Sequence, residues 1–310
     1  MSEACWGLFG LNVLSELALP FPEEPVSPAR ESVRVAFAPL APQGHWITTS
    51  EPNDLQLEIP DVARFRIIAG QEILIDPSPG VSDRNLRVYL LGSAFGALLH
   101  QRGLLPLHAN AVVVKGQAVA FMGASGAGKS SLAVWFQDHG YSILADDLCA
   151  VSCGQAEPPQ VLPGVPRLRL WKDAVARSGR ESDELELSFD GQDKFDLPAP
   201  RNAIASPAPL AGCYLLGEPE AARAPRITRL AGAEAIEALI ANTYRGKFLK
   251  LVGSAERHFE ACLEVNRSVP VYRVERVKAV EDFESVARML EDHVQTLVGQ
   301  ALEPLALRRK

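Results

Sequence analysis

The stretch Gly123-Ala-Ser-Gly-Ala-Gly-Lys129-Ser130 decides the fold of this chain. It satisfies the pattern G-x-x-x-x-G-K-[ST], in which glycines let backbone N–H groups approach phosphate oxygens without obstruction by a Cβ atom. In such loops the lysine reaches the β- and γ-phosphates of a nucleotide, and the serine hydroxyl joins the coordination of Mg²⁺. We therefore predict a phosphate-binding loop whose nucleotide contacts are Gly123, Ala124, Ser125, Gly126, Ala127, Gly128, Lys129, Ser130 and Ser131.

The segments around this loop have the pattern of an α/β layer. Apolar residues at 111–114 and 118–122 flank Lys115-Gly116-Gln117, which is typical of a hairpin. Residues 129–139 follow as an amphipathic helix, and residues 141–145 form another apolar strand. Strand, loop, helix and strand in this order predict an α/β fold, in which the positive end of the helix points at the bound phosphate.

Two adjacent acids, Asp146 and Asp147, end the strand 141–145. Near a phosphate-binding loop, one acid at a strand tip commonly holds Mg²⁺, and a neighbour can accept the proton of an attacking hydroxyl. A turn with solvated carboxylates is the alternative. The spacing does not decide which aspartate takes which role. His108 precedes the strand 111–114 and is a candidate catalytic residue, with a packed or surface imidazole as the alternative.

Three arginines are candidate contacts to phosphate or to an anionic substrate, because guanidinium suits both. Arg167 and Arg169 alternate along a strand-like run, where solvated strand residues are the alternative. Arg245 follows the predicted helix 233–244, where a cation also stabilises the helix dipole without a role in any site. Residues 172–200 are polar and acidic, and they predict either a flap over substrate or a loop without regular structure.

The chain has 310 residues, more than one hydrophobic core usually supports, so two domains are expected. The first, residues 1–105, is predicted to be a smaller β-rich or α/β domain that positions a substrate or regulates the second. Its predicted elements are strands at 33–37, 55–59, 64–68 and 72–75 and a helix at 85–102. The second, residues 106–310, holds the whole predicted nucleotide site. Its later predicted elements are strands at 211–216 and 270–277 and helices at 233–244 and 280–298.

The composition excludes several classes of protein. A net charge of −7 argues against a general nucleic-acid partner, because neutralising phosphates requires a basic surface. No apolar run approaches the roughly 20 residues of a membrane span, and the N-terminal segment lacks the basic region of a signal peptide. Five scattered cysteines fit a reducing compartment, so we expect a cytoplasmic protein. A homo-oligomer is compatible with the sequence.

Three stretches together resemble the catalytic domain of HPr kinase/phosphorylase: Leu107-His108-Ala109, the loop 123–131 and Ala145-Asp146-Asp147. The family has a histidine one hairpin before the loop and an Asp-Asp pair one helix after it. The resemblance is strongest over residues 105–152. It implies an α/β fold with a P-loop kinase domain of the HPr kinase C-terminal type, and ATP and Mg²⁺ as cofactors.

The same resemblance implies a role for each site residue. Asp146 would be the catalytic base, and His108 would assist it. Asp147 and Ser130 would contact the metal ion. Lys129 would hold the phosphates and take part in catalysis.

Residues 162–171 depart from the pattern of the bifunctional enzymes. They read Leu-Pro-Gly-Val-Pro-Arg-Leu-Arg-Leu-Trp and lack the glutamate of a Glu-x-Arg-Gly-type signature linked to phosphorolysis. This departure argues against phosphorylase activity. The N-terminal region also differs from the regulatory domain of those enzymes.

A closer likeness covers most of the chain, through residues 98–108 and 163–171. It is to the HPr-kinase-like proteins of lasso peptide pathways. That likeness implies ATP-dependent phosphorylation of a serine near the C-terminus of a ribosomal precursor peptide. The expected partner is thus a precursor peptide or a small protein. The alternatives are a nucleotide-binding regulator without transferase activity, an HPr-type protein serine kinase and a small-molecule kinase.

Overall fold

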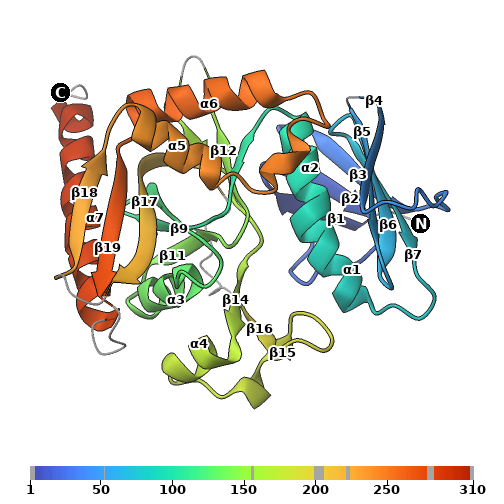
Figure 1. Cartoon of the computed structure of the whole chain (residues 1–310), viewed down its shortest axis with the longest axis horizontal. Helices are drawn as coiled ribbons and strands as arrows, with labels where there is room; N and C mark the ends of the chain where they lie inside the picture. Colours follow the sequence, from blue (N-terminus) through green and yellow to red (C-terminus); the bar gives the residue numbers. More distant parts are fainter. Residues whose placement is uncertain are drawn as a thin grey trace.

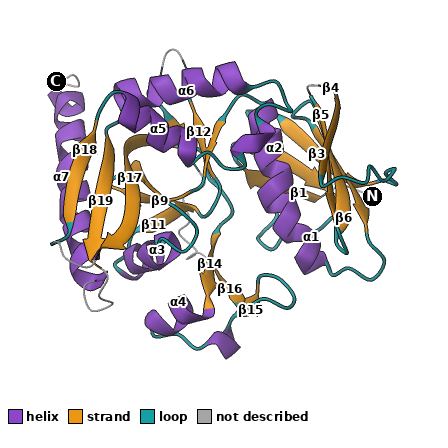
Figure 2. Cartoon of the chain, viewed as in Figure 1, coloured by secondary structure: helices purple, strands orange, loops and turns teal. Residues whose placement is uncertain are grey.

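The computed structural model describes residues 4–51, 53–154, 157–198, 206–220, 224–277 and 283–307. Within these residues the chain forms two large β-sheets and one small sheet, with helices packed against them (Figure 1). Figure 2 shows β-sheets and helices packed together in the described chain, which confirms a mixed α/β class. No helix in the described ranges is long and apolar enough to cross a membrane.

The first sheet is built from the N-terminal residues. Its strands lie in the order β1-β2-β3-β7-β6-β5-β4. Their bounds are Ala4–Leu8 (β1), Leu11–Ser15 (β2), Ser32–Phe37 (β3), Ile47–Glu51 (β4), Asp54–Ile59 (β5), Ala63–Ile68 (β6) and Glu72–Pro77 (β7). Alternation along β5 explains the two faces of the sheet. Leu55, Leu57 and Ile59 are buried, whereas Asp54 and Glu58 on the other face form ion pairs with Arg66 and Arg64 of β6. The four strands predicted in this region are confirmed, and β1, β2 and β4 were not predicted.

A broken helix covers the buried face of this sheet. It consists of α1 (Asp83–Tyr89), a π-helical turn (Leu90–Ala94) and α2 (Phe95–Gln101), which confirms the helix predicted at 85–102. Figure 1 places α2 between the first sheet and the rest of the chain. The core beneath it also contains residues from beyond position 105, namely Leu148, Ala150, Tyr244, Phe248 and Val252. The two halves of the chain therefore share part of one core.

The second sheet contains the strand before the glycine-rich loop. Its main path is β11-β9-β10-β17-β13-β12-β8, and β19 joins it by pairing with β17 and β18. The bounds are Leu105–Leu107 (β8), Ala109–Val114 (β9), Gln117–Met122 (β10), Ser142–Ala145 (β11), Cys149–Ser152 (β12), Gln160–Val161 (β13), Ala208–Glu220 (β17), Arg226–Leu230 (β18) and Val271–Val277 (β19). The predicted hairpin and the strands predicted at 141–145, 211–216 and 270–277 are all present.

Helices cover both faces of the second sheet. On one face, α3 (Lys129–Asp138) and α7 (Phe283–Leu307) bury Phe136 and Leu290 against Phe121 of β10 and its neighbours. On the other, α5 (Ala233–Ala241) and α6 (Ala255–Ser268) pack Leu239 and Val265 against the strands. The predicted helices are present, but α5 ends earlier than expected, residues 280–282 of the last prediction lie outside the described residues, and α6 was not predicted.

The segment 167–198 forms a third, small sheet that we call the accessory sheet. Its strands are β14 (Arg167–Trp171), β15 (Glu186–Leu187) and β16 (Lys194–Pro198), in the order β14-β16-β15, with α4 (Lys172–Arg177) and a 3₁₀ turn (Ser182–Glu184) between them. The expectation of a loop without regular structure is therefore wrong up to residue 198, and residues 199–200 lie outside the described residues. The physical reason is the alternation of Leu168, Leu170, Phe195 and Leu197, which join the core under α3.

Candidate functional site

The glycine-rich loop, residues 123–128, joins the end of β10 to the start of α3. Its backbone requires glycine at two points. Gly128 has φ 82°, in the left-handed region, and forms the N-cap of α3. A Cβ atom on Gly123 would lie 3.0 Å from the carbonyl oxygen of Leu216 in the neighbouring strand β17. The loop therefore packs closely against the sheet and lies at the N-terminus of a ten-residue helix, which is a favourable place for an anion.

Lys129 is buried at the base of this loop. Its Nζ atom donates to the carbonyl oxygens of Gly123 (2.7 Å) and Ala124 (3.1 Å), and its side chain is 6% exposed. Burial lowers its pKa, while the charges of Asp147 and Asp146 oppose that change. The ammonium thus lies folded onto the loop, within electrostatic reach of both aspartates.

Arg276 of β19 supports the loop from the other side. Its guanidinium donates to the carbonyl oxygen of Ala127 (2.7 Å) in the loop and, through Nε, to that of Gly217 (3.1 Å) in β17. These bonds tie the loop to β17 and β19 through backbone carbonyl oxygens. No sequence motif points to this arginine.

Asp146 and Asp147 lie at the same sheet edge as the loop. Strand β9 pairs antiparallel with both β10 and β11, so β10 and β11 run in the same direction and their C-terminal ends meet there. Asp147 has φ 65°, a conformation that aspartate tolerates better than most side chains and that turns the chain sharply after β11.

The two aspartates have different environments. In Asp147, Oδ1 lies 3.0 Å from His108 Nε2, and Oδ2 accepts from the Arg169 guanidinium at 2.7 Å. Burial opposes its ionisation, but these two partners hold its pKa well below the usual value. In Asp146, Oδ2 accepts from the backbone N–H of Arg169 at 2.7 Å, whereas Oδ1 is buried and has no hydrogen-bond partner. Burial, followed by the charge of Asp147, raises the pKa of Asp146 to about 6.

His108 reaches Asp147 from the junction of β8 and β9. Its backbone N–H donates to the carbonyl oxygen of Asn242 (2.7 Å), and its ring lies edge-on to Tyr244, with 6.1 Å between ring centroids. In the structure, the His108 imidazole therefore contacts the carboxylate of Asp147. The family resemblance implies instead that His108 assists Asp146.

One cavity of about 110 Å³ brings these groups together. It is bounded by the glycine-rich loop, the start of α3, Asp147, and the accessory sheet with α4. Its lining residues are His108, Ser125, Gly126, Gly128, Lys129, Ser130, Ser131, Asp147, Arg169, Trp171, Asp173, Ala174, Arg177 and Lys194. The last six of these come from the accessory sheet and α4, and only Arg169 among them was a predicted site residue.

The other two predicted arginines lie elsewhere. Arg167 forms an ion pair with Asp196 and lines a separate pocket between the accessory sheet and α1. Arg245 lies over the ring of Trp46, with 5.8 Å from its guanidinium carbon to the ring centroid, and it is not among the residues that line the cavity.

The residues present fit a phosphate-bound Mg²⁺ ion. Magnesium prefers oxygen ligands and usually binds through one or two carboxylates together with substrate phosphates. Ser130 and Asp147 supply such oxygens in the cavity, whereas Asp146, whose Oδ1 is buried and unpartnered, is not among the residues that line it. No group of three or more His, Cys, Asp or Glu side chains that could hold a metal ion occurs in the described part of the chain. The donor set therefore suits a metal ion that arrives with a nucleotide.

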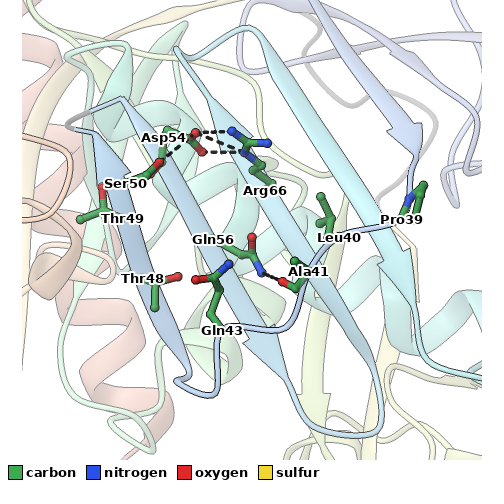
Figure 3. A pocket seen from close by; sticks show the side chains of 10 residues that line it. All are labelled: Pro39, Leu40, Ala41, Gln43, Thr48, Thr49, Ser50, Asp54, Gln56 and Arg66. Atoms are coloured by element: carbon green, nitrogen blue, oxygen red, sulfur yellow. Dashed lines mark hydrogen bonds and ion pairs between the residues drawn. The ribbon is translucent and has the colours of Figure 1, made fainter.

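A larger cavity, of about 490 Å³, lies on the outer face of the first sheet (Figure 3). Several of its polar side chains already have partners: Arg66 and Ser50 bond to Asp54, and Gln56 donates to the carbonyl oxygen of Ala41. None of the described residues that line it has a buried polar atom without a partner. The cavity therefore contains no group that indicates a ligand.

Comparisons with known proteins add a structural likeness. No protein-family model and no curated protein matches the chain. Among solved structures, it is similar to the Hpr(Ser) kinase/phosphatase from Coxiella burnetii, with a TM-score of 0.36 and 14% sequence identity. The alignment covers 63% of this chain and 94% of that chain. The function proposed below therefore rests on the cavity and on the sequence motifs.

Proposed function

We propose that this chain is an ATP- and Mg²⁺-dependent kinase that phosphorylates a serine hydroxyl of a precursor peptide or a small protein. The observation that carries the proposal is the cavity, because it combines the Lys129 loop with the carboxylate of Asp147 at one sheet edge. Asp146 precedes Asp147 in the chain, its charge acts on Lys129, and its buried Oδ1 has no hydrogen-bond partner. Positioning and charge stabilisation are the main demands of phosphoryl transfer, and this site supplies both.

Different residues of the chain would bind the phosphates, hold the metal ion and accept the proton. Lys129 and the loop N–H groups bind the phosphates, and Ser130 and Asp147 would hold the metal ion. When bound, Mg²⁺ neutralises charge on the phosphates. The serine oxygen forms a bond to the γ-phosphorus, the bond to the oxygen bridging the β- and γ-phosphorus breaks, and ADP leaves. Asp146 Oδ1 accepts the hydroxyl proton.

The unequal environments of the two carboxylates support this division. A general base works best when its pKa lies near the operating pH, and burial raises the pKa of Asp146 to about 6. His108 and Arg169 keep the pKa of Asp147 low, so this carboxylate stays ionised, as a metal ligand must. Two neighbouring acids whose pKa values are pushed apart are typical of an acid–base pair with separate roles.

A peptide acceptor is supported by the sequence resemblance and by the mouth of the cavity. Trp171 lines the cavity and is 47% exposed, so it presents an apolar surface beside the site. Arg177 and Asp173, which form an ion pair at 2.8 Å, lie at the same mouth and offer both charges to a bound chain.

The test is mass spectrometry of acceptors incubated with the full chain, ATP and Mg²⁺. A precursor peptide encoded beside this chain, the same peptide with its C-terminal serines changed to alanine, and an HPr protein are compared. We expect the mass of one phosphoryl group on the serine peptide, none on the alanine peptide, and loss of transfer in Asp146→Asn, with Asp183→Asn as the exposed control. ATP binding without phosphorylation of any acceptor would contradict the proposal and favour a nucleotide-binding regulator.

A further inference from the structure

Lys194 is a second lysine in the cavity, and it comes from the accessory sheet. It begins β16 and pairs with Trp171 of β14. Its side chain is half-buried and lines the same cavity as Lys129 and Asp147. Its charge acts on Lys129 and on both aspartates, so it lies within electrostatic reach of the whole predicted site.

Lys194 differs from the two arginines of the cavity because it has no carboxylate partner among the described residues. It differs from Lys129 because, within the described part of the chain, its Nζ atom donates to no backbone carbonyl oxygen. Arg169 is paired with Asp147, and Arg177 with Asp173. No described carboxylate forms an ion pair with Lys194, whose Nζ atom lies 5.4 Å from the centroid of the Trp171 ring. Burial, followed by the neighbouring charge of Arg169, lowers its pKa. A half-buried ammonium beside another cation is costly to the fold, so an anionic ligand would satisfy it.

The backbone holds Lys194 in place from both sides. Its N–H donates to the carbonyl oxygen of Gln192, and its own carbonyl oxygen accepts from Ser188, in each case within the β15–β16 connection. That connection is in turn attached to the N-terminus of α1, where Asp190 pairs with Arg84 at 2.9 Å. Backbone hydrogen bonds and an ion pair therefore fix the strand that contains Lys194. This fixed position limits the conformational entropy that the lysine loses when it binds a ligand.

We propose that Lys194 contacts the γ-phosphoryl group of the bound nucleotide and makes the site prefer a triphosphate to a diphosphate. This assignment rests on the proposed function. The glycine-rich loop and the start of α3 would hold the inner phosphates, whereas Lys194 enters the same cavity from the accessory sheet and lies within electrostatic reach of Asp146 and Asp147. The terminal phosphate is the one that lies toward the carboxylates in that arrangement, because the acceptor must be there to receive it.

The test compares the affinities of ADP and of a non-hydrolysable ATP analogue by calorimetry with Mg²⁺ present. In Lys194→Gln we expect the analogue to bind about tenfold or more weakly, because a charge-assisted hydrogen bond is lost. The affinity for ADP should stay within about twofold. Lys194→Arg should restore most of the preference, since it retains the charge. The matched control is Lys172→Gln, which removes an exposed lysine from the same accessory sheet.

Three outcomes would overturn the assignment. An unchanged ratio of the two affinities in Lys194→Gln would show that this lysine does not contact the terminal phosphate. An equal loss of affinity for both ligands in Lys194→Gln would show that the lysine stabilises the site as a whole. The same loss of affinity in Lys194→Arg would show that the packing of the side chain matters, not its charge. By contrast, a wild-type protein that binds neither nucleotide refutes the proposed function itself.

Discussion

Asp146→Asn should stabilise the protein at neutral pH while abolishing phosphoryl transfer. The wild-type carboxylate is 8% exposed, lies next to the charge of Asp147, and leaves Oδ1 without a partner. A negative charge there destabilises the folded state, and the amide removes it. The asparagine oxygen can still accept from the Arg169 N–H, which now bonds to Oδ2 of the aspartate at 2.7 Å.

The expected size of the effect follows from the pKa. Folding raises the pKa of Asp146 from 3.8 to about 6, a rise of about two units. At about 1.4 kcal/mol per unit, the ionised carboxylate costs about 3 kcal/mol at pH 8. The new amide N–H₂ takes the place of the unpartnered oxygen, at a cost of about 1 to 2 kcal/mol. The net gain at pH 8 is about 1 to 2 kcal/mol, or about 2 to 3 °C in Tm for a chain of this length.

The pH dependence has a definite sign. Between pH 3.8 and about 6 the folded wild-type protein keeps a proton that the unfolded chain has lost. Its stability therefore falls as pH rises through that window and stays low above it. The advantage of Asp146→Asn should thus be full at pH 8 and should vanish or reverse near pH 4.5.

Thermal unfolding followed by circular dichroism at several pH values, with EDTA and without nucleotide, measures this difference. Asp183→Asn serves as the control. The Asp183 carboxylate is exposed, so this substitution removes a charge that is not buried. If Asp146→Asn were less stable than the wild-type protein at pH 8, or if the difference did not depend on pH, the buried charge would not be the source of the effect.

Two further predictions concern His108 and Asp190, which position the site residues Asp147 and Lys194. His108→Asn should lower kcat about tenfold to a hundredfold and raise the Mg²⁺ concentration needed for half-maximal rate, because partners that orient a metal ligand have effects of that size. ATP affinity measured without metal should not change; a fall there would mean that His108 contacts the nucleotide. Asp190→Ala should leave Tm nearly unchanged, because exposed ion pairs contribute little, yet lower kcat/KM several-fold by releasing the strand that carries Lys194. An unchanged kcat/KM would contradict that connection.

Local pattern was sufficient for much of the fold. The alternation of residues 54–59 and 63–68 predicts strands because one face of the sheet is buried and the other is solvated. The accessory sheet was indicated only in part, through the strand-like run that carries Arg167 and Arg169. Its strands have two to five residues, and the apolar positions that place them in the core lie more than twenty residues apart in the chain. Strand pairing over such distances leaves little signal in any single window.

The sequence by itself determined the glycine-rich loop, Lys129 and the pair of acids, because backbone access to phosphate requires glycines at fixed spacing. Only the tertiary structure distinguished Asp146 from Asp147, since neighbouring residues of the same type differ through burial and through His108 and Arg169. It also brought Lys194 to the cavity from a strand that no motif marks. Charge and burial depend on what the folded chain places nearby, and neither can be read from spacing along the chain.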